Sequence, residues 1–235
     1  MVLLGVDTAT ADAVVGVSAD GEALVEARVG PAPDGRPRHS QVLLPEIDRA
    51  VAEAGGWERV DRIAVGIGPG SYTGLRIGIA TARALAQARG IAIVPVGSLA
   101  ALARGISTAA ESVAAALPVI DARRGEAFAA LFDADGVEVW PPFVAPPDEL
   151  VARLGELDSA PLAAGDGALR FAAELEGAGA TVAPPQDPIH RIAARHVCAV
   201  GEAAAEAPPD RIQPLYLRPP DAKRWIERDR GGPGG

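Results

Sequence analysis

The glycine-rich segment GPGSYTGLR at residues 68–76 has the residue types most suited to chemistry in this chain of 235 residues. It lies between an apolar run at 63–67 and an alanine-rich stretch at 77–89. Backbone N–H groups at such a corner can bind an anion, or the small residues can let a helix pack tightly on a sheet. The segment lacks the Lys-Ser/Thr ending of a Walker phosphate loop, and its glycine spacing is not that of a dinucleotide loop. The segment therefore predicts a strand, a tight corner and a helix, and it leaves the ligand open.

The other reactive residue types are scattered along the chain. His39 is far from His190 and His196, and these two are six residues apart, which places them on different helix faces. We interpret His39 as a hydrogen-bonded helix-start residue and the other two as ordinary helix residues. Cys198, the only cysteine, fits a small buried position in a helix and excludes an internal disulfide. A catalytic metal needs about three protein ligands, and no cluster in the sequence supplies them.

Composition restricts the partners of this protein. A formal net charge of -9 argues against binding of a nucleic-acid phosphate backbone by this chain without a partner. Aromatic residues make up only 4% of the chain, so few side chains are available to stack on bases. The sequence has neither a signal peptide nor an apolar run of membrane-spanning length, which predicts a cytoplasmic protein.

The hydrophobic pattern predicts the elements that hold these residues. Pro45 lies one turn into the first expected helix, so we expect the start of that helix to be kinked or broken. In the first half we expect strands at 2–6, 13–17, 23–29, near 63 and at 91–96, and helices at 40–54, 75–89 and 98–105. In the second half we expect strands at 113–120, 126–132, 137–140 and near 162, and helices at 148–154, 168–176 and 192–205.

Both halves therefore read strand, strand, Asp-Gly turn, strand, helix, strand, glycine corner and helix. The first strand of each half ends at an aspartate, Asp7 or Asp121. This repetition predicts a duplicated α/β fold of the actin-like (ASKHA, RNase H-like) kind, with two lobes of mixed sheet, flanking helices and a cleft that both aspartates face. We place the lobes at 1–105 and 106–218, followed by a flexible tail at 219–235.

The loop after the first strand is the one place that suggests a nucleotide. Asp7, Thr8 and Thr10 are candidates for holding a phosphate or Mg²⁺, as the first loop of actin-like proteins does. Thr8 replaces the usual glycine, and Asp166 in the second glycine corner repels a phosphate. We therefore expect weak nucleotide binding at most, and a leftover turn is the simpler interpretation.

Several segments resemble one protein family. LGVDTAT at 4–10, HSQVLLP at 39–45, DAR at 121–123, GDGA at 165–168 and PLYLR at 214–218 match its landmarks, and GPGSYTGLRIG at 68–78 matches its most specific signature. On these motifs the chain is identified as a member of the glycoprotease-like TsaB family, also called YeaZ. The signature loop consists of Gly68, Pro69, Gly70, Ser71, Thr73, Gly74 and Arg76.

The resemblance implies a non-catalytic paralogue of TsaD, the subunit that transfers a threonylcarbamoyl group to adenosine 37, 3′ to the anticodon, in ANN-decoding tRNAs. A TsaB protein is implied to bind and stabilise TsaD, and to reach the small ATPase TsaE and tRNA only through TsaD. It is also implied to form a homodimer when TsaD is absent. No cofactor and no membrane contact are implied.

A TsaD-like active site would need two metal-binding histidines one helical turn apart, after a strand that ends in Pro-Val. Ser98 and Leu102 stand at those two positions. We therefore expect neither a metal nor a catalytic residue in this chain.

The expected partner interface lies on the helices at 40–54 and 75–89. The second helix carries small residues on every face, and small side chains let two helices approach closely. Two helices from this chain and two from a similar partner would form a four-helix contact. The residues expected at the interface are Val42, Leu43, Ile47, Gly78, Ala82 and Ala86.

Enzymatic functions remain as alternatives to a scaffold. They are an actin-like phosphotransferase or a metal-dependent acyl transferase acting alone, and a glycoprotease. Each needs ligands or a nucleophile that we do not find in the sequence. The sequence leaves open the affinity and stoichiometry of the interface, and whether the basic tail touches tRNA.

Overall fold

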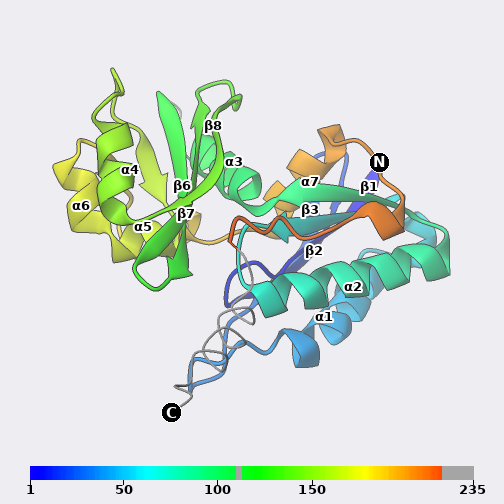
Figure 1. Ribbon diagram of the computed structural model, residues 1–235. Helices are drawn as coiled ribbons and strands as arrows, with labels where there is room; N and C mark the ends of the chain where they lie inside the picture. Colours follow the sequence, from blue (N-terminus) through cyan, green and yellow to red (C-terminus); the bar gives the residue numbers. More distant parts are fainter. Residues whose placement is uncertain (110–112, 219–235) are drawn as a thin grey trace, which may run out of the picture.

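The computed structural model describes residues 1–109 and 113–218, which form two five-stranded sheets (Figure 1). The tail at 219–235, for which we expected flexibility, lies outside the described residues. The first sheet has the order β3-β2-β1-β4-β5 and contains β1 (Val2–Asp7), β2 (Ala13–Ala19), β3 (Glu22–Val29), β4 (Arg62–Gly68) and β5 (Ala92–Gly97). The second has the order β10-β9-β6-β7-β8 and contains β6 (Ala115–Arg123), β7 (Glu126–Asp133), β8 (Glu138–Ala145), β9 (Leu162–Ala164) and β10 (Thr181–Val182).

The two sheets have the same connectivity. In each, the first three strands form an antiparallel meander, and the first strand also pairs in parallel with the fourth. The fifth strand then adds in parallel to the fourth. This repeat confirms the predicted duplicated actin-like fold of two mixed-sheet lobes.

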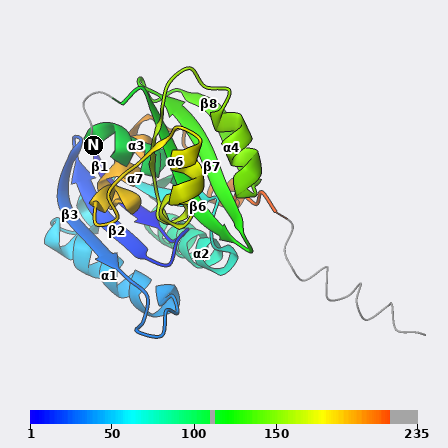
Figure 2. The ribbon, with the colours of Figure 1, turned by 90° about the vertical axis from the view of Figure 1, so that its left-hand side faces the viewer.

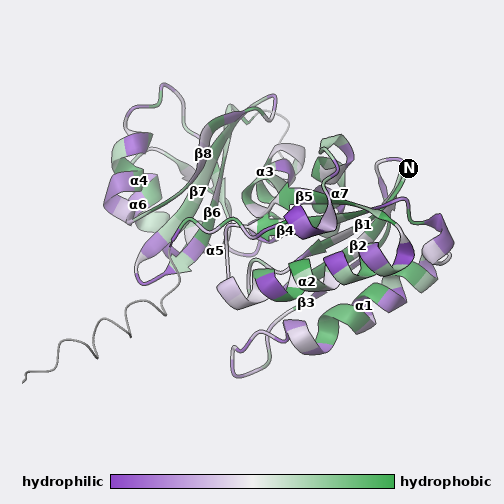
Figure 3. Ribbon diagram, turned by 45° about the vertical axis from the view of Figure 1, so that its right-hand side comes forward, coloured by the Kyte–Doolittle hydropathy of each residue, from purple (hydrophilic) through white to green (hydrophobic). Residues whose placement is uncertain are grey.

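Helices cover both faces of the first sheet. On one face α1 (His39–Glu53) packs on β2 and α2 (Tyr72–Arg89) packs on β4, and the two helices lie side by side (Figure 1). Their ribbons alternate between hydrophilic and hydrophobic residues, as expected for half-exposed helices (Figure 3). The expected break at Pro45 is wrong, because α1 runs through it without interruption. Pro45 and Gln41, four residues earlier, are both exposed, so water can satisfy the carbonyl that loses its intrahelical bond.

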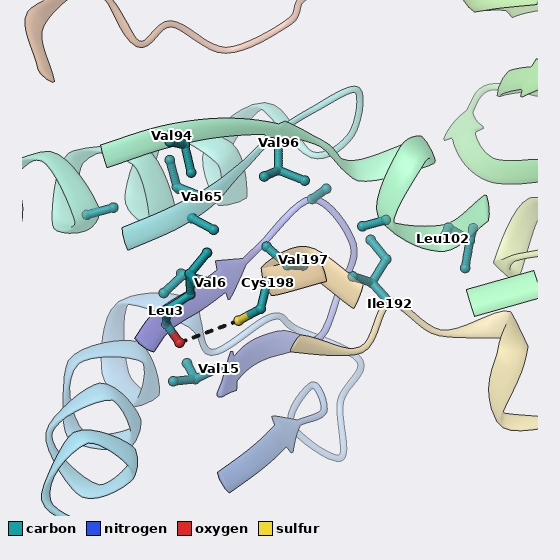
Figure 4. Packing of buried hydrophobic residues seen from close by; sticks show 14 of the residues in the cluster. Leu3, Val6, Val15, Val65, Val94, Val96, Leu102, Ile192, Val197 and Cys198 are labelled. Atoms are coloured by element: carbon teal, nitrogen blue, oxygen red, sulfur yellow. Dashed lines mark hydrogen bonds between the residues drawn. The ribbon is translucent and has the colours of Figure 1, made fainter. Parts of the chain in front are cut away.

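The last helix returns to the first lobe. α7 (Ala194–Ala203) packs against β1, β2 and β4, on the face opposite α1 and α2. Cys198 is buried there, and its Sγ lies 3.6 Å from the carbonyl oxygen of Leu3 (Figure 4). Its buried position in a helix confirms the prediction for this cysteine. The segment 194–203, which we had placed in the second lobe, thus completes the core of the first.

The helix between the lobes is longer than expected. α3 (Ser98–Ala109) does not end at Gly105, so the boundary that we placed there falls within a helix. A Cβ at Gly105 would lie 3.2 Å from the His196 ring of α7. This glycine therefore permits close helix packing instead of ending the helix. Burial lowers the pKa of His196 to about 4.

The outer helices of the second lobe are short. α4 (Pro147–Leu154), α5 (Asp166–Arg170) and α6 (Ala172–Gly177) lie on the side of the second sheet away from the first lobe (Figures 1 and 2). The single helix expected at 168–176 is divided at Phe171, whose side chain is buried in this lobe's core. Single turns of 3₁₀-helix occur at Trp57–Arg59, Pro188–His190 and Pro209–Arg211. No helix in the described ranges is long and apolar enough to cross a membrane.

Candidate functional site

A cavity of about 500 Å³ lies between the two lobes. Its walls come from the loop after β1, the N-terminal turn of α2, the β6–β7 hairpin and the C-terminal segment 215–218. Segments far apart in the sequence therefore meet at one site, as expected for a cleft between duplicated α/β lobes.

The charged groups of the cavity are largely engaged with one another. Both carboxylate oxygens of Asp121 accept hydrogen bonds of 2.9 Å from Nη1 of Arg170. Oδ1 of Asp166 accepts a hydrogen bond of 3.0 Å from the backbone N of Asp121, and burial raises the pKa of Asp166. Asp121 does face the cavity, as predicted, but it forms an ion pair there and is not an open metal ligand.

Asp7 does not face the cavity, which corrects the expectation for this residue. It is 1% exposed and does not line the cavity. One carboxylate oxygen accepts a hydrogen bond of 2.7 Å from the Ser98 hydroxyl, and the other accepts one of 2.7 Å from the backbone N of Ala9. Gly66 on β4 makes room for this carboxylate, because a Cβ there would lie 1.9 Å from Oδ2. Ser98, at a position where a catalytic relative would hold a metal, is thus a hydrogen-bond donor to Asp7.

The signature loop packs the start of α2 directly onto the loop after β1. Ser71 caps α2, its hydroxyl accepting a hydrogen bond of 3.2 Å from the backbone N of Gly74. Its own backbone N donates to the carbonyl of Ala9 at 2.7 Å. Thr8 donates from its hydroxyl to the carbonyl of Gly74 at 2.8 Å. The sequence left open whether the glycine-rich segment binds an anion or lets a helix pack tightly. These hydrogen bonds support tight packing.

The three residues expected to hold a nucleotide lie in different environments in the structure. Asp7 and Thr8 are buried with their side chains used internally, whereas Thr10 lines the cavity. A phosphate would have to replace the hydrogen bond of Thr8 to α2, or those of Asp7 with Ser98 and Ala9.

Sequence reasoning missed an aromatic stack at the cavity mouth. The rings of Tyr72 and Tyr216 stack with their centroids 5.1 Å apart. The guanidinium of Arg76 lies 4.1 Å from the centre of the Tyr72 ring, and its Nε donates to the Tyr216 hydroxyl at 3.0 Å. The family motifs contain all three residues, but only the fold brings the C-terminal segment back to α2.

The β6–β7 hairpin carries another feature without a clear sequence signal. Arg123 and Arg124 adopt left-handed backbone angles, with φ of 64° and 56°, and both line the cavity. Such angles are unfavourable for residues with a Cβ and tend to occur where a site requires a particular backbone shape.

Five of the six expected interface residues lie in the chain's own core. Leu43, Ile47, Gly78, Ala82 and Ala86 are buried, and Val42 is half-buried. The five buried residues pack inside the first lobe, so they are not on the surface that a partner would meet. We define the outer α1–α2 face as the solvent-exposed positions Leu44 and Pro45 of α1 and Ala80, Ala84 and Ala88 of α2. Leu44 is 49% exposed.

Two of the three histidines hold loops in place. Nε2 of His39 donates to the carbonyl of Asp12 at 3.2 Å, which confirms its predicted role at the start of a helix. His190 is not in the expected α-helix but in the 3₁₀ turn, where its Nδ1 accepts a hydrogen bond of 3.1 Å from the backbone N of Gly165. Among residues 1–109 and 113–218, no group of three or more His, Cys, Asp or Glu side chains could hold a metal ion.

The buried carboxyl of Asp7 makes a testable contribution to stability. Burial raises its pKa from 3.8 to about 6, so the folded protein holds this proton more tightly than the unfolded chain does. The contribution of Asp7 to stability therefore falls as the pH rises from about 4 to about 6, and the loss is complete above that range. We expect Asp7→Asn to raise the free energy of unfolding by about 1–2 kcal/mol at pH 7.5 and to give no gain at pH 4.

Urea denaturation of the wild type and Asp7→Asn at pH 4, 5, 6 and 7.5 measures this difference. A difference between the two proteins that is constant across these pH values would contradict the assignment.

Comparison with known proteins gives consistent matches. The family model for TsaD, described as tRNA N6-adenosine threonylcarbamoyltransferase, matches residues 32–155. An uncharacterized protein of Mycobacterium leprae is 34% identical over 94% of this chain, and this chain spans 56% of that relative. The tRNA threonylcarbamoyladenosine biosynthesis protein TsaB of Escherichia coli is 31% identical over 60% of this chain and 58% of its own length. The structure of YeaZ from Pseudomonas aeruginosa superposes with a TM-score of 0.75 at 25% identity, covering 92% of this chain and 99% of YeaZ.

Proposed function

Because this chain belongs to the TsaB (YeaZ) family, we propose that it is a non-catalytic scaffold in the formation of tRNA threonylcarbamoyladenosine. In this role it binds and stabilises the catalytic subunit TsaD, which modifies adenosine 37 of ANN-decoding tRNAs. It meets TsaE and tRNA through TsaD, and it forms a homodimer when TsaD is absent.

The main support for this proposal is that the residues expected to bind a nucleotide are hydrogen-bonded within the chain itself. The carboxylate of Asp7 is held by Ser98 and by the backbone of Ala9, and the hydroxyl of Thr8 is held by α2. Both residues would have to be released before they could bind a phosphate or a metal. This arrangement favours a binding role over a phosphotransferase or acyl transferase acting alone.

The outer α1–α2 face is the surface that we assign to the partner. Ala80, Ala84 and Ala88 are spaced by four residues, so they form one exposed stripe of small side chains along α2. Leu44 adds an exposed apolar side chain on α1, which contacts α2. A helix of the partner can approach such a stripe closely and bury the leucine. A paralogue with the same fold offers matching helices, and so does a second copy of this chain.

Deleting the gene for this chain in its host tests the function. We expect threonylcarbamoyladenosine in total tRNA to fall below detection, because TsaD loses its stabilising subunit. Mass spectrometry of tRNA nucleosides measures the loss, and a plasmid copy of the wild-type gene serves as the control by restoring the modification. A normal level of modified nucleoside in the deletion strain would overturn the proposed function.

A further inference from the structure

Three arginines gather where the first turn of α7 contacts β3, outside the set of residues that line the interlobe cavity. They are Arg28 on β3, Arg191 just before α7, and Arg195 in the first turn of α7. The carboxylates among them belong to Asp12 and Glu26. Figure 2 shows β3 and α7 on the same side of the molecule.

The ion pairs in this group differ in how closely the guanidinium groups approach the carboxylates. Arg195 is in hydrogen-bond contact with Glu26, since both its backbone N and its guanidinium donate to that carboxylate. Arg28 and Arg191 share one carboxylate oxygen of Asp12, and each approaches it only to 3.9 Å. That distance is too long for a hydrogen bond, so Asp12 attracts both guanidinium groups without satisfying their N–H donors.

One donor of this group remains without a partner within the described part of the chain. The Nε of Arg28 is buried and has no hydrogen-bond acceptor among the described residues. A buried donor of this kind is costly, particularly on a charged group. Burial lowers the pKa of Arg28, and the nearby charges of Arg191 and Arg195 act in the same direction against the attraction of Asp12.

The charge of the group favours an anion. Three guanidinium groups face two carboxylates, which leaves a formal excess of one positive charge on a protein whose net charge is -9. The positive end of the α7 dipole adds to the attraction. A monocarboxylate would compete poorly with the tethered Asp12, whereas a doubly charged anion with several oxygens could reach two guanidinium groups at once.

We propose that Arg28 and Arg191 form a binding site for a dianionic phosphate, either free or as the terminal group of a phosphate monoester. Asp12 is the internal competitor that occupies the arginines until the phosphate binds. Arg191 is exposed and is the residue through which the ligand enters, because Arg28 is more deeply buried.

Titration of the full chain with inorganic phosphate tests this site. Ionic strength is held constant with potassium chloride, and the arginine Nε–Hε signals are followed by NMR. We expect saturable shifts for Arg28 and Arg191. Arg191→Gln should weaken the affinity at least tenfold, because one of the two guanidinium groups is lost. Asp12→Asn should strengthen the affinity several-fold, because the competing carboxylate is removed.

Arg104→Gln is the matched control, since Arg104 is an exposed arginine of α3 outside this group, and we expect it to leave the affinity unchanged. A parallel titration with glycerol 3-phosphate distinguishes a site for monoesters from one for free phosphate. The proposal is overturned if phosphate gives no saturable shift, if Arg191→Gln binds as the wild type does, or if Asp12→Asn binds more weakly. Binding of an unphosphorylated RNA oligonucleotide without binding of inorganic phosphate would also overturn it.

Discussion

Gly74→Ala is expected to destabilise the first lobe by about 3 kcal/mol or more. A Cβ at this position would lie 2.1 Å from the carbonyl oxygen of Thr8 and 3.0 Å from the His39 ring. The Thr8 carbonyl is backbone in the loop after β1, and this loop is itself held by hydrogen bonds to α2 and Ser71. Neither α2 nor the loop after β1 can therefore shift without a loss of stability.

Urea denaturation followed by circular dichroism measures this loss. Gly177→Ala serves as the control, because a Cβ at Gly177, the last residue of α6, would meet nothing within 4 Å. We expect the control to match the wild type or to be slightly more stable, as alanine generally is relative to glycine in a helix. Equal stability of Gly74→Ala and Gly177→Ala would mean that α2 does not pack on the first loop as described.

Ala84→Trp is expected to abolish binding of TsaD while leaving the fold intact. Ala84 is exposed at the centre of the stripe on α2, so a bulky ring fits in solvent but prevents the close approach of a partner helix. A clash at the centre of an interface typically costs several kcal/mol, so we expect the dissociation constant to rise more than about 100-fold. Calorimetry with purified TsaD measures the affinity, and light scattering of the variant alone measures loss of the homodimer.

A second tryptophan substitution serves as the control for this experiment. Ala173→Trp places the same side chain at an exposed position of α6 in the second lobe, and it should leave binding unchanged. Ala82→Trp is unsuitable, because Ala82 is fully buried and a tryptophan there would disrupt the core. Unimpaired TsaD binding by folded Ala84→Trp would place the interface elsewhere.

The sequence by itself determined the family, the duplication and most of the elements, although it did not predict β10. Local signals suffice for these features, because hydrophobic periodicity and Asp-Gly turns depend on neighbouring residues. The glycine corner before α2 was predictable for the same reason. The longer span of α3 was not, because the role of Gly105 depends on a histidine ring that comes from α7.

Only the tertiary structure decided which surfaces face outward and which residues meet. Alanine occurs all around α2, so composition could not tell the buried Ala82 from the exposed Ala84. Asp7 and Asp121 occupy equivalent places in the two halves, yet Asp7 is buried against Ser98 whereas Asp121 lines the cavity. These outcomes depend on contacts between residues far apart in the chain. α7 and the C-terminal segment both return to the first lobe, and their packing there decides which side of each element is buried.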